Sequence, residues 1–321
     1  MLLTLFILIA SLVLLVKGSD VVVDEISSLA VYLRVSPFII GLTVIAIGTS
    51  FPELATSVYS ALEGTPQIGL GNILGSNIYN LGFNLALGLF LLAVPFRRKY
   101  FLDDAIILFV ITSLFFIFSL DGYLSFTEGA ASLFLFFCYF LYQMKTSPRP
   151  VIKEIKTFTR ERKYPFLSLT FFSSLCYLTL GLVALIFGAK HLIISILDLS
   201  SELGLSEKII SLTLIAFGTA LPELFVTINA TRKGLADVFL GNIIGSNAAN
   251  ILLVLGVSSL ITPIPFSSFD LFFTIPLLLF LTLLLVHYLM KETASSRFTG
   301  FLLFLCYGLF LLSLFVFGPM V

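Results

Sequence analysis

The chain consists of long apolar runs that few charged residues interrupt, and this feature limits its possible folds more than any other. Of its 321 residues, 59% are apolar and 11% are charged, and the mean hydropathy is +1.11. A soluble domain carries charge on roughly a quarter of its residues, because its surface faces water. With so little charge, most of the surface must face lipid, so we expect an integral membrane protein.

Ten of the apolar runs are long enough to cross the hydrocarbon core, which takes about 20 residues of helix. A backbone inside lipid must satisfy its own hydrogen bonds, and runs of this length do so as helices. The sequence therefore predicts an all-α membrane protein with ten transmembrane helices. Their approximate ranges are 2–33, 37–62, 67–94, 102–120, 126–144, 165–199, 207–231, 237–262, 270–290 and 298–317.

Lys and Arg residues predict the orientation, because they concentrate in the connections that follow odd-numbered spans. Basic residues are favoured in cytoplasmic connections. We expect a plasma (inner) membrane protein, and this bias places both of its termini outside and its basic loop 145–164 in the cytoplasm. The net charge of zero argues against nucleic acid as a partner. We also expect a monomer that is surrounded by membrane lipid.

Two motifs recur in the sequence at one constant spacing. The shift that places Gly48 on Gly218 superposes GTSFPEL at 48–54 on GTALPEL at 218–224. The same shift superposes GNILGSN at 71–77 on GNIIGSN at 241–247, without a gap. Such self-similarity at a fixed period is the signature of an internal repeat.

The repeat predicts two five-helix halves, residues 1–144 and 165–321, joined by the basic linker 145–164. Because five is an odd number, the second half would enter the membrane with the opposite polarity. The two halves are therefore expected to be inverted-topology repeats, an architecture typical of secondary transporters.

Glu53 and Glu223 are the two acids that lie near the middle of strongly apolar spans. An ionised carboxylate costs several kcal/mol at that depth unless it is paired or binds an ion. Neither repeat core contains a Lys or Arg to pair with them, so bound cations or protons must supply the opposite charge. We therefore predict a cation site at these two residues.

A proline precedes each of the two glutamates, at Pro52 and Pro222. Proline has no backbone N–H, so both helices should kink there and leave the carbonyl four residues earlier without its helical partner. A freed carbonyl beside a carboxylate is a set of hard oxygen ligands, which suits Ca²⁺ or Na⁺. Hydroxyl groups in the same turns belong to Thr49, Ser50 and Thr219.

The second motif of each half adds amide and hydroxyl groups three to four residues apart, so that some of them share a helical face. These residues are Asn72, Ser76, Asn77 and Asn80 in the first half and Asn242, Ser246, Asn247 and Asn250 in the second.

At these two motifs the sequence resembles the cation/calcium exchanger superfamily, and within it the prokaryotic sodium/calcium exchangers, whose repeats carry GTS-x-PEL followed by GN-x-x-GSN. The resemblance implies a secondary antiporter and not an enzyme. This antiporter would exchange Ca²⁺ for Na⁺ by alternating access and would need no cofactor. The Ca²⁺ ligands that it implies are the carboxylates of Glu53 and Glu223 and the carbonyls of Thr49 and Thr219. The flanking Na⁺ ligands that it implies are the carbonyls of Ala46 and Ala216 and the hydroxyls of Ser50, Ser76 and Ser246.

Two positions depart from the pattern of the sodium/calcium exchangers. Ala220 occupies the position that corresponds to Ser50, so one flanking Na⁺ site would lack a hydroxyl ligand. Asn250 stands where these exchangers commonly carry Asp, and with Asn80 it gives a pair of amides that also resembles the proton/calcium exchangers. Because the proline before each glutamate resembles the sodium-coupled branch, we expect Na⁺/Ca²⁺ exchange, with H⁺/Ca²⁺ exchange at the same site as the alternative.

Three further interpretations use the same two carboxylates. They could be protonated and hydrogen-bonded to hold helices together, or serve a passive cation channel that needs no counter-ion. An intramembrane enzyme could use them as general acid and base, but it would need unequal surroundings for the pair, and the repeat predicts near-identical ones.

Overall fold

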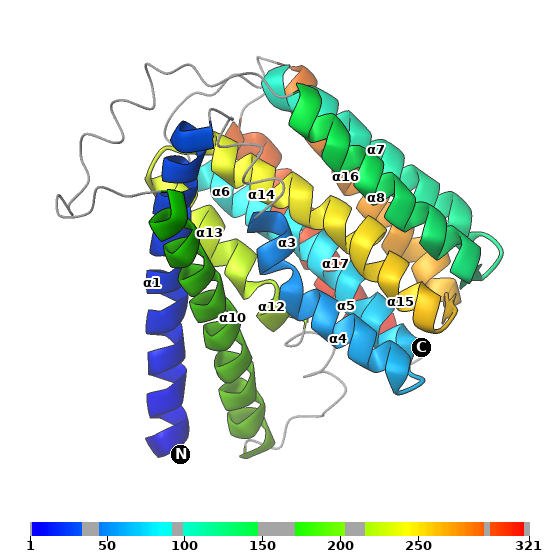
Figure 1. Ribbon diagram of the computed structural model, residues 1–321. Coiled ribbons are helices and arrows are strands. Elements are labelled where there is room, and N and C mark those ends of the chain that lie inside the picture. Colours follow the sequence, from blue (N-terminus) through cyan, green and yellow to red (C-terminus); the bar gives the residue numbers. More distant parts are fainter. Residues whose placement is uncertain are drawn as a thin grey trace.

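The structure is a computed structural model that describes residues 2–33, 45–91, 99–146, 171–202, 216–291 and 296–317. Helices make up nearly all of this part of the chain, so the predicted all-α class is confirmed. Figure 1 shows a bundle of long helices, with α1 and α10 standing together at one side of it. Most of the linker 145–164, the first residues of span 165–199 and parts of spans 37–62 and 207–231 lie outside the described residues.

The described elements of the first half are mostly helices. They are α1 (Leu2–Leu33), α3 (Ala46–Thr49), α4 (Phe51–Leu62), α5 (Pro66–Tyr79), the π-helical turn η2 (Asn80–Asn84), α6 (Leu85–Leu91), α7 (Lys99–Ser119), β1 (Tyr123–Leu124) and α8 (Phe126–Thr146).

The second half contains a closely similar series. It comprises α10 (Phe171–Glu202), α12 (Ala216–Thr219), α13 (Leu221–Arg232), α14 (Ala236–Ala249), η4 (Asn250–Val254), α15 (Leu255–Ile261), β2 (Ile264–Pro265), η5 (Asp270–Thr274), α16 (Ile275–Met290) and α17 (Ser296–Phe317). The strands β1 and β2 form one short antiparallel pair, with Leu124 opposite Ile264.

The sequence repeat has a counterpart in the boundaries of the helices. From α3 to α6, every element begins and ends at the positions that the repeat pairs with the boundaries of its counterpart in the series from α12 to α15. The turns after α4 and α13 also match, since each contains a glycine with positive φ, 75° at Gly64 and 71° at Gly234. Residues with a Cβ atom rarely adopt this backbone conformation, so glycine suits both turns. The opposite membrane polarity of the two halves stays a prediction.

The helices that carry the glutamates are interrupted where the prolines predict a kink. The short helix α3 ends at Thr49, Ser50 forms a turn, and α4 begins at Phe51 with Pro52 in its first turn. The same interruption separates α12 from α13 at Ala220. Proline is tolerated in the first turn of a helix, where its missing N–H costs nothing. The predicted kinks are therefore confirmed, in the form of a break between two helices.

Several of the helices have the length and composition of membrane spans. Within the described ranges, five helices are long and apolar enough to cross a membrane, and Phe172–Gly188 is a shorter apolar helix. The five are Pro66–Leu91, Phe101–Ser119, Ala236–Ile261, Asp270–Met290 and Arg297–Leu314. The full number of ten spans stays a prediction.

Small residues bring α1 and α10 into close contact. A Cβ atom added at Gly18 would lie 3.0 Å from the carbonyl oxygen of Gly181, and one at Gly188 would lie 3.0 Å from that of Ser11. Without side chains at these positions, the two helix backbones can approach each other closely. The pair meets the remainder of the bundle mainly through α3, α12 and α13.

Gly88 in α6 provides a test of this packing. A Cβ atom at Gly88 would lie 2.2 Å from the ring of Phe239 in α14, which is fully buried. Because the surrounding side chains hold the ring in place, we expect Gly88→Ala to lower the free energy of unfolding by about 1–3 kcal/mol. Thermal unfolding of the purified variant measures the loss. Gly308→Ala is the control, since nothing lies within 4 Å of its added Cβ, and equal stability of the two variants would contradict the prediction.

Candidate functional site

The carboxylates of Glu53 in α4 and Glu223 in α13 are completely buried. Each lies in the first turn of its helix, where the helix dipole favours negative charge. In the part of the chain that the structure describes, no Lys or Arg is buried, and the two carboxylates repel each other. The Oε2 atom of each carboxylate has no hydrogen-bond partner. The pair therefore lacks an internal counter-charge.

Hydroxyl groups from both halves surround the carboxylate of Glu53. The hydroxyl of Ser76 in α5 donates to Glu53 Oε1 at 3.4 Å and lies 3.5 Å from the hydroxyl of Thr219. Thr219, which ends α12, in turn donates to Oδ1 of Asn72 at 3.0 Å. This cluster therefore joins α4 and α5 of the first half to α12 of the second.

The surroundings of Glu223 repeat these contacts with the halves exchanged. Ser246 in α14 donates to Glu223 Oε1 at 3.4 Å and lies 3.5 Å from the hydroxyl of Thr49. Thr49 donates to Oδ1 of Asn242 at 3.4 Å. Each of these residues is the repeat counterpart of a residue around Glu53. The two motifs of each half thus meet those of the other half in one composite site.

One contact breaks the symmetry between the two carboxylates. The hydroxyl of Ser50 donates to Glu223 Oε1 at 3.4 Å across the two halves. The corresponding residue, Ala220, is fully buried but has no hydroxyl and can make no such bond to Glu53. The two glutamates therefore have similar but unequal surroundings.

Asn80 and Asn250 are buried but form hydrogen bonds with other amides rather than with the carboxylates. Asn250 Nδ2 donates to Asn77 Oδ1 at 2.9 Å, and Asn77 Nδ2 donates to the carbonyl of Asn247 at 3.3 Å. Asn84 Nδ2 donates to Asn80 Oδ1 at 3.4 Å. Nδ2 of Asn80 and Oδ1 of Asn250 have no hydrogen-bond partner. Both residues begin a π-helical turn, a feature that is frequent at functional sites.

The carbonyl of Ala46, which the resemblance assigns to a Na⁺ site, already accepts a hydrogen bond from the N–H of Ser50 at 3.0 Å. The single proton of the Thr49 hydroxyl can be donated either to this carbonyl or to Oδ1 of Asn242, each 3.4 Å away. A cation would have to compete with the Ser50 donor. Ala216 begins α12, at the position equivalent to Ala46.

Asn72 and Asn242 belong to the second motif of each half but are not among the ligands expected from the sequence. The structure places both beside the central threonines, with each Nδ2 atom lacking a hydrogen-bond partner. The signal was present in the sequence, because both residues precede the site serines by four positions and therefore share their helical face.

The chemistry of this composite site suits hard cations. Its polar atoms are carboxylate, hydroxyl and amide oxygens, which Ca²⁺ and Na⁺ prefer. Softer metals usually bind clusters of His and Cys. Among the described residues, no group of three or more His, Cys, Asp or Glu gathers in one place.

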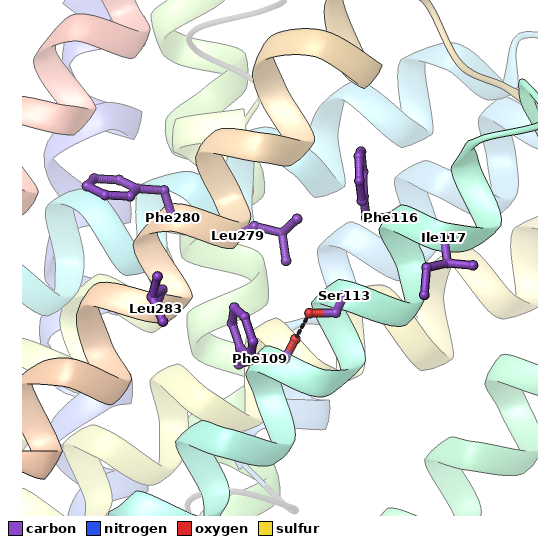
Figure 2. Close-up of a pocket in the computed structure, with 7 residues that line it drawn as sticks. All are labelled: Phe109, Ser113, Phe116, Ile117, Leu279, Phe280 and Leu283. Carbon is purple, nitrogen blue, oxygen red and sulfur yellow. Dashed lines mark hydrogen bonds between the residues drawn. The ribbon is translucent and has the colours of Figure 1, made fainter.

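A pocket on the side of the bundle offers different chemistry. Figure 2 shows it between α7 and α16, and its one hydroxyl, on Ser113, donates to the carbonyl of Phe109 in its own helix at 2.7 Å. The lining is otherwise apolar, which suits hydrocarbon and not a cation. Its residues are Phe109, Ser113, Phe116, Ile117, Leu279, Phe280 and Leu283.

Comparison with known proteins assigns the family. The family model described as "Sodium/calcium exchanger protein" matches residues 3–145 and 173–316. The chain therefore belongs to the sodium/calcium exchanger family, as its motifs predict. It is a multi-pass integral membrane protein of the class that exchanges Ca²⁺ and other cations.

Individual relatives resemble the chain over nearly its whole length. Sodium/calcium exchanger MaX1 of Methanosarcina acetivorans is 34% identical, and the match covers 96% of this chain and 97% of that protein. Inner membrane protein YrbG of Escherichia coli is also 34% identical, with 82% and 81% covered. A solved structure of the sodium-calcium exchanger NCX_Mj, soaked with Na⁺ and Ca²⁺, superposes with a TM-score of 0.84 at 31% identity, covering 97% of this chain and 98% of that one.

The hydroxyl of Thr219 should be important for stability when no ion is bound. Thr219→Val removes the bond to Asn72 and leaves that buried amide oxygen without its donor, so we expect a loss of about 1–2 kcal/mol in the free energy of unfolding. Denaturant unfolding in ion-free buffer measures it. Thr179→Val is the control, since Thr179 is exposed and its hydroxyl bonds only to its own helix. An equal loss in both variants would show that the Thr219 contact contributes nothing specific.

Proposed function

We propose that the protein is a secondary antiporter that exchanges Ca²⁺ for Na⁺ by alternating access, with Glu53 and Glu223 at its central cation site. The observation that carries this proposal is the pair of fully buried carboxylates, with no buried Lys or Arg in the described residues. Two carboxylates supply two negative charges, which one Ca²⁺ neutralises. Membership of the family supports the same ions.

Charge neutralisation explains why transport would be an exchange. A site that carries two uncompensated charges is costly to move through an apolar environment. Once a Ca²⁺ or competing Na⁺ ions neutralise it, the loaded protein can change between its outward and inward states, whereas the empty one cannot. Each crossing therefore requires a bound ion, so that the ions move in exchange.

The proposed ligands follow from the composite geometry. Ca²⁺ would bind between the two carboxylates, with the backbone carbonyls at the two helix breaks completing its shell. Na⁺ ions would occupy flanking positions near the serines, with Asn80 and Asn250 as neighbouring amides. The proposed set is Glu53, Glu223, Thr49, Thr219, Ser50, Ser76, Ser246, Asn80, Asn250, Ala46 and Ala216.

The proposed architecture has ten spans in two inverted halves, residues 1–144 and 165–321, with both termini outside and the linker 145–164 in the cytoplasm. The matching element boundaries at the repeat spacing support the two halves. The exchanged contacts around Glu53 and Glu223 support a pseudo-two-fold relation between them.

H⁺/Ca²⁺ exchange on the same carboxylates is the second candidate. Two observations favour it: the buried pair of neutral amides, Asn80 and Asn250, and the hydroxyl that is missing at Ala220. A proton needs no coordination shell, so the loss of one oxygen ligand would affect Na⁺ binding more than proton binding.

Removing either carboxylate should abolish exchange. Glu53→Gln and Glu223→Gln each leave one negative charge, which cannot neutralise Ca²⁺, so we expect uptake of radiolabelled Ca²⁺ into Na⁺-loaded proteoliposomes to fall to the level of empty vesicles. Asp103→Asn on the exposed side of α7 is the matched control and should keep its uptake. Normal Ca²⁺ uptake in either glutamate variant would refute the site.

The driving ion should be identified by gradients applied one at a time. We expect an outward Na⁺ gradient at equal pH to drive Ca²⁺ uptake, and Ala220→Ser to lower the Na⁺ concentration that gives half-maximal rate by a few-fold, because it adds an oxygen ligand. Thr179→Ser, on an exposed helix face, is the control. Uptake driven by a proton gradient alone, and unchanged in Ala220→Ser, would establish proton coupling instead.

A further inference from the structure

A charged contact joins α1 to the end of α13, away from the central site. Nζ of Lys233 lies 2.9 Å from Oδ1 of Asp24 and 3.6 Å from Oδ1 of Asp20. Beside this ion pair, Nδ2 of the buried Asn229 donates to the hydroxyl of Ser19. These contacts hold α1 against α13, and in the predicted orientation they lie on the cytoplasmic side.

The sequence repeat gives this contact a counterpart in which the charges are exchanged. At the repeat spacing, Lys233 corresponds to Glu63 at the end of α4, and Asp20 corresponds to Lys190 in α10. The other half can therefore form an ion pair of the same kind with the signs reversed. In the described part of the structure, both residues are exposed and no ion pair joins them.

The helix faces beside the two contacts also differ, since the face of α13 is covered and the equivalent face of α4 is exposed. On α13, Leu221 and Asn229 are 3% and 7% exposed, and α1 packs against this helix. The equivalent residues of α4, Phe51 and Tyr59, are 53% and 66% exposed, and α10 has little contact with that helix in the described residues. The structure therefore has one of two equivalent helix contacts formed and the other open.

We propose that the two ion pairs are alternate latches for the α1–α10 pair. Lys233 with Asp20 and Asp24 holds the state seen here. Lys190 with Glu63 holds the opposite state, in which α10 covers the open face of α4. This inference rests on the alternating access of the proposed function, and adds to it the residues that select each state.

The exchange of charges makes each latch selective. Acidic α1 attracts Lys233 but repels Glu63, whereas Lys190 on α10 attracts Glu63 but repels Lys233. Each helix therefore has one complementary partner, and the wrong contact is disfavoured by repulsion as well as by the lack of attraction. Because the charged groups of the pair seen here are partly exposed, the latch is weak enough to open. It would bias the two states without trapping either of them.

Hydrogen–deuterium exchange of the full-length protein in lipid nanodiscs tests the proposal without requiring transport. We expect Lys233→Gln to raise amide exchange in residues 221–235 and to lower it in residues 51–65, by about two- to fivefold. Lys190→Gln should change both segments in the opposite directions. Lys145→Gln, in the last turn of α8, is the matched control and should change neither. Figure 1 shows α8 on the opposite side of the bundle from α1.

A charge-reversed double variant separates the latch from damage to the fold. Lys233→Asp should shift the two segments as Lys233→Gln does, and adding Asp24→Lys should restore the wild-type pattern. Faster exchange in residues 221–235 with no reciprocal change in residues 51–65 would overturn the proposal, as would failure of the double variant to restore exchange. These hydrogen-exchange outcomes test the latches separately from the proposed function. A failure of Ca²⁺ uptake would contradict the proposed function but would not alter the reciprocal exchange pattern.

Discussion

The burial of two carboxylates without a basic partner is the constraint on which the rest of this structure depends. A membrane protein can retain such groups only where polar atoms from its own chain, or bound ions, take the place of water. The helix breaks at Ser50 and Ala220 satisfy part of this need, because they place Glu53 and Glu223 at helix N-termini and bring serine and threonine hydroxyls beside them. One oxygen of each carboxylate still lacks a partner. This remaining demand is what a cation would satisfy.

Duplication explains how one chain builds such a site from two short motifs. Neither half encloses a carboxylate alone, since Ser76 of the first half contacts Thr219 of the second, and Ser246 contacts Thr49. Symmetry of this kind also offers two equivalent arrangements of the halves, which alternating access requires. Where the halves differ in sequence, they can take different roles. Ser50 bonds across to Glu223 while Ala220 cannot bond to Glu53, so the proposed flanking Na⁺ positions would differ there.

The sequence predicts the features that depend on local chemistry. Hydrophobic length predicts the helices, and the missing N–H of Pro52 and Pro222 predicts the interruptions, because each effect acts within one or two turns. The sequence does not predict the three π-helical turns η2, η4 and η5, since one extra residue in a turn leaves no mark in a hydrophobic pattern. The bonds from Thr219 to Asn72 and from Lys233 to Asp24 could not be read either, because they depend on how distant helices are placed. The constant spacing of the repeat predicts which residues of the two halves are equivalent, but not which residues contact each other.

Electrostatics acts at two strengths in this molecule, and the difference suits an exchanger. At the centre the two carboxylates are fully buried, so an uncompensated charge there is expensive, and in the proposed mechanism it forbids movement of the empty site. At the helix ends the Lys233 pair is partly exposed, so solvent weakens it and it can only bias the position of α1 and α10. In the proposed exchange, this strong barrier at the site would make ion binding obligatory for each crossing. A weak preference at the edge can then set how long each state lasts without blocking the crossing itself, because the neutralised site no longer opposes it.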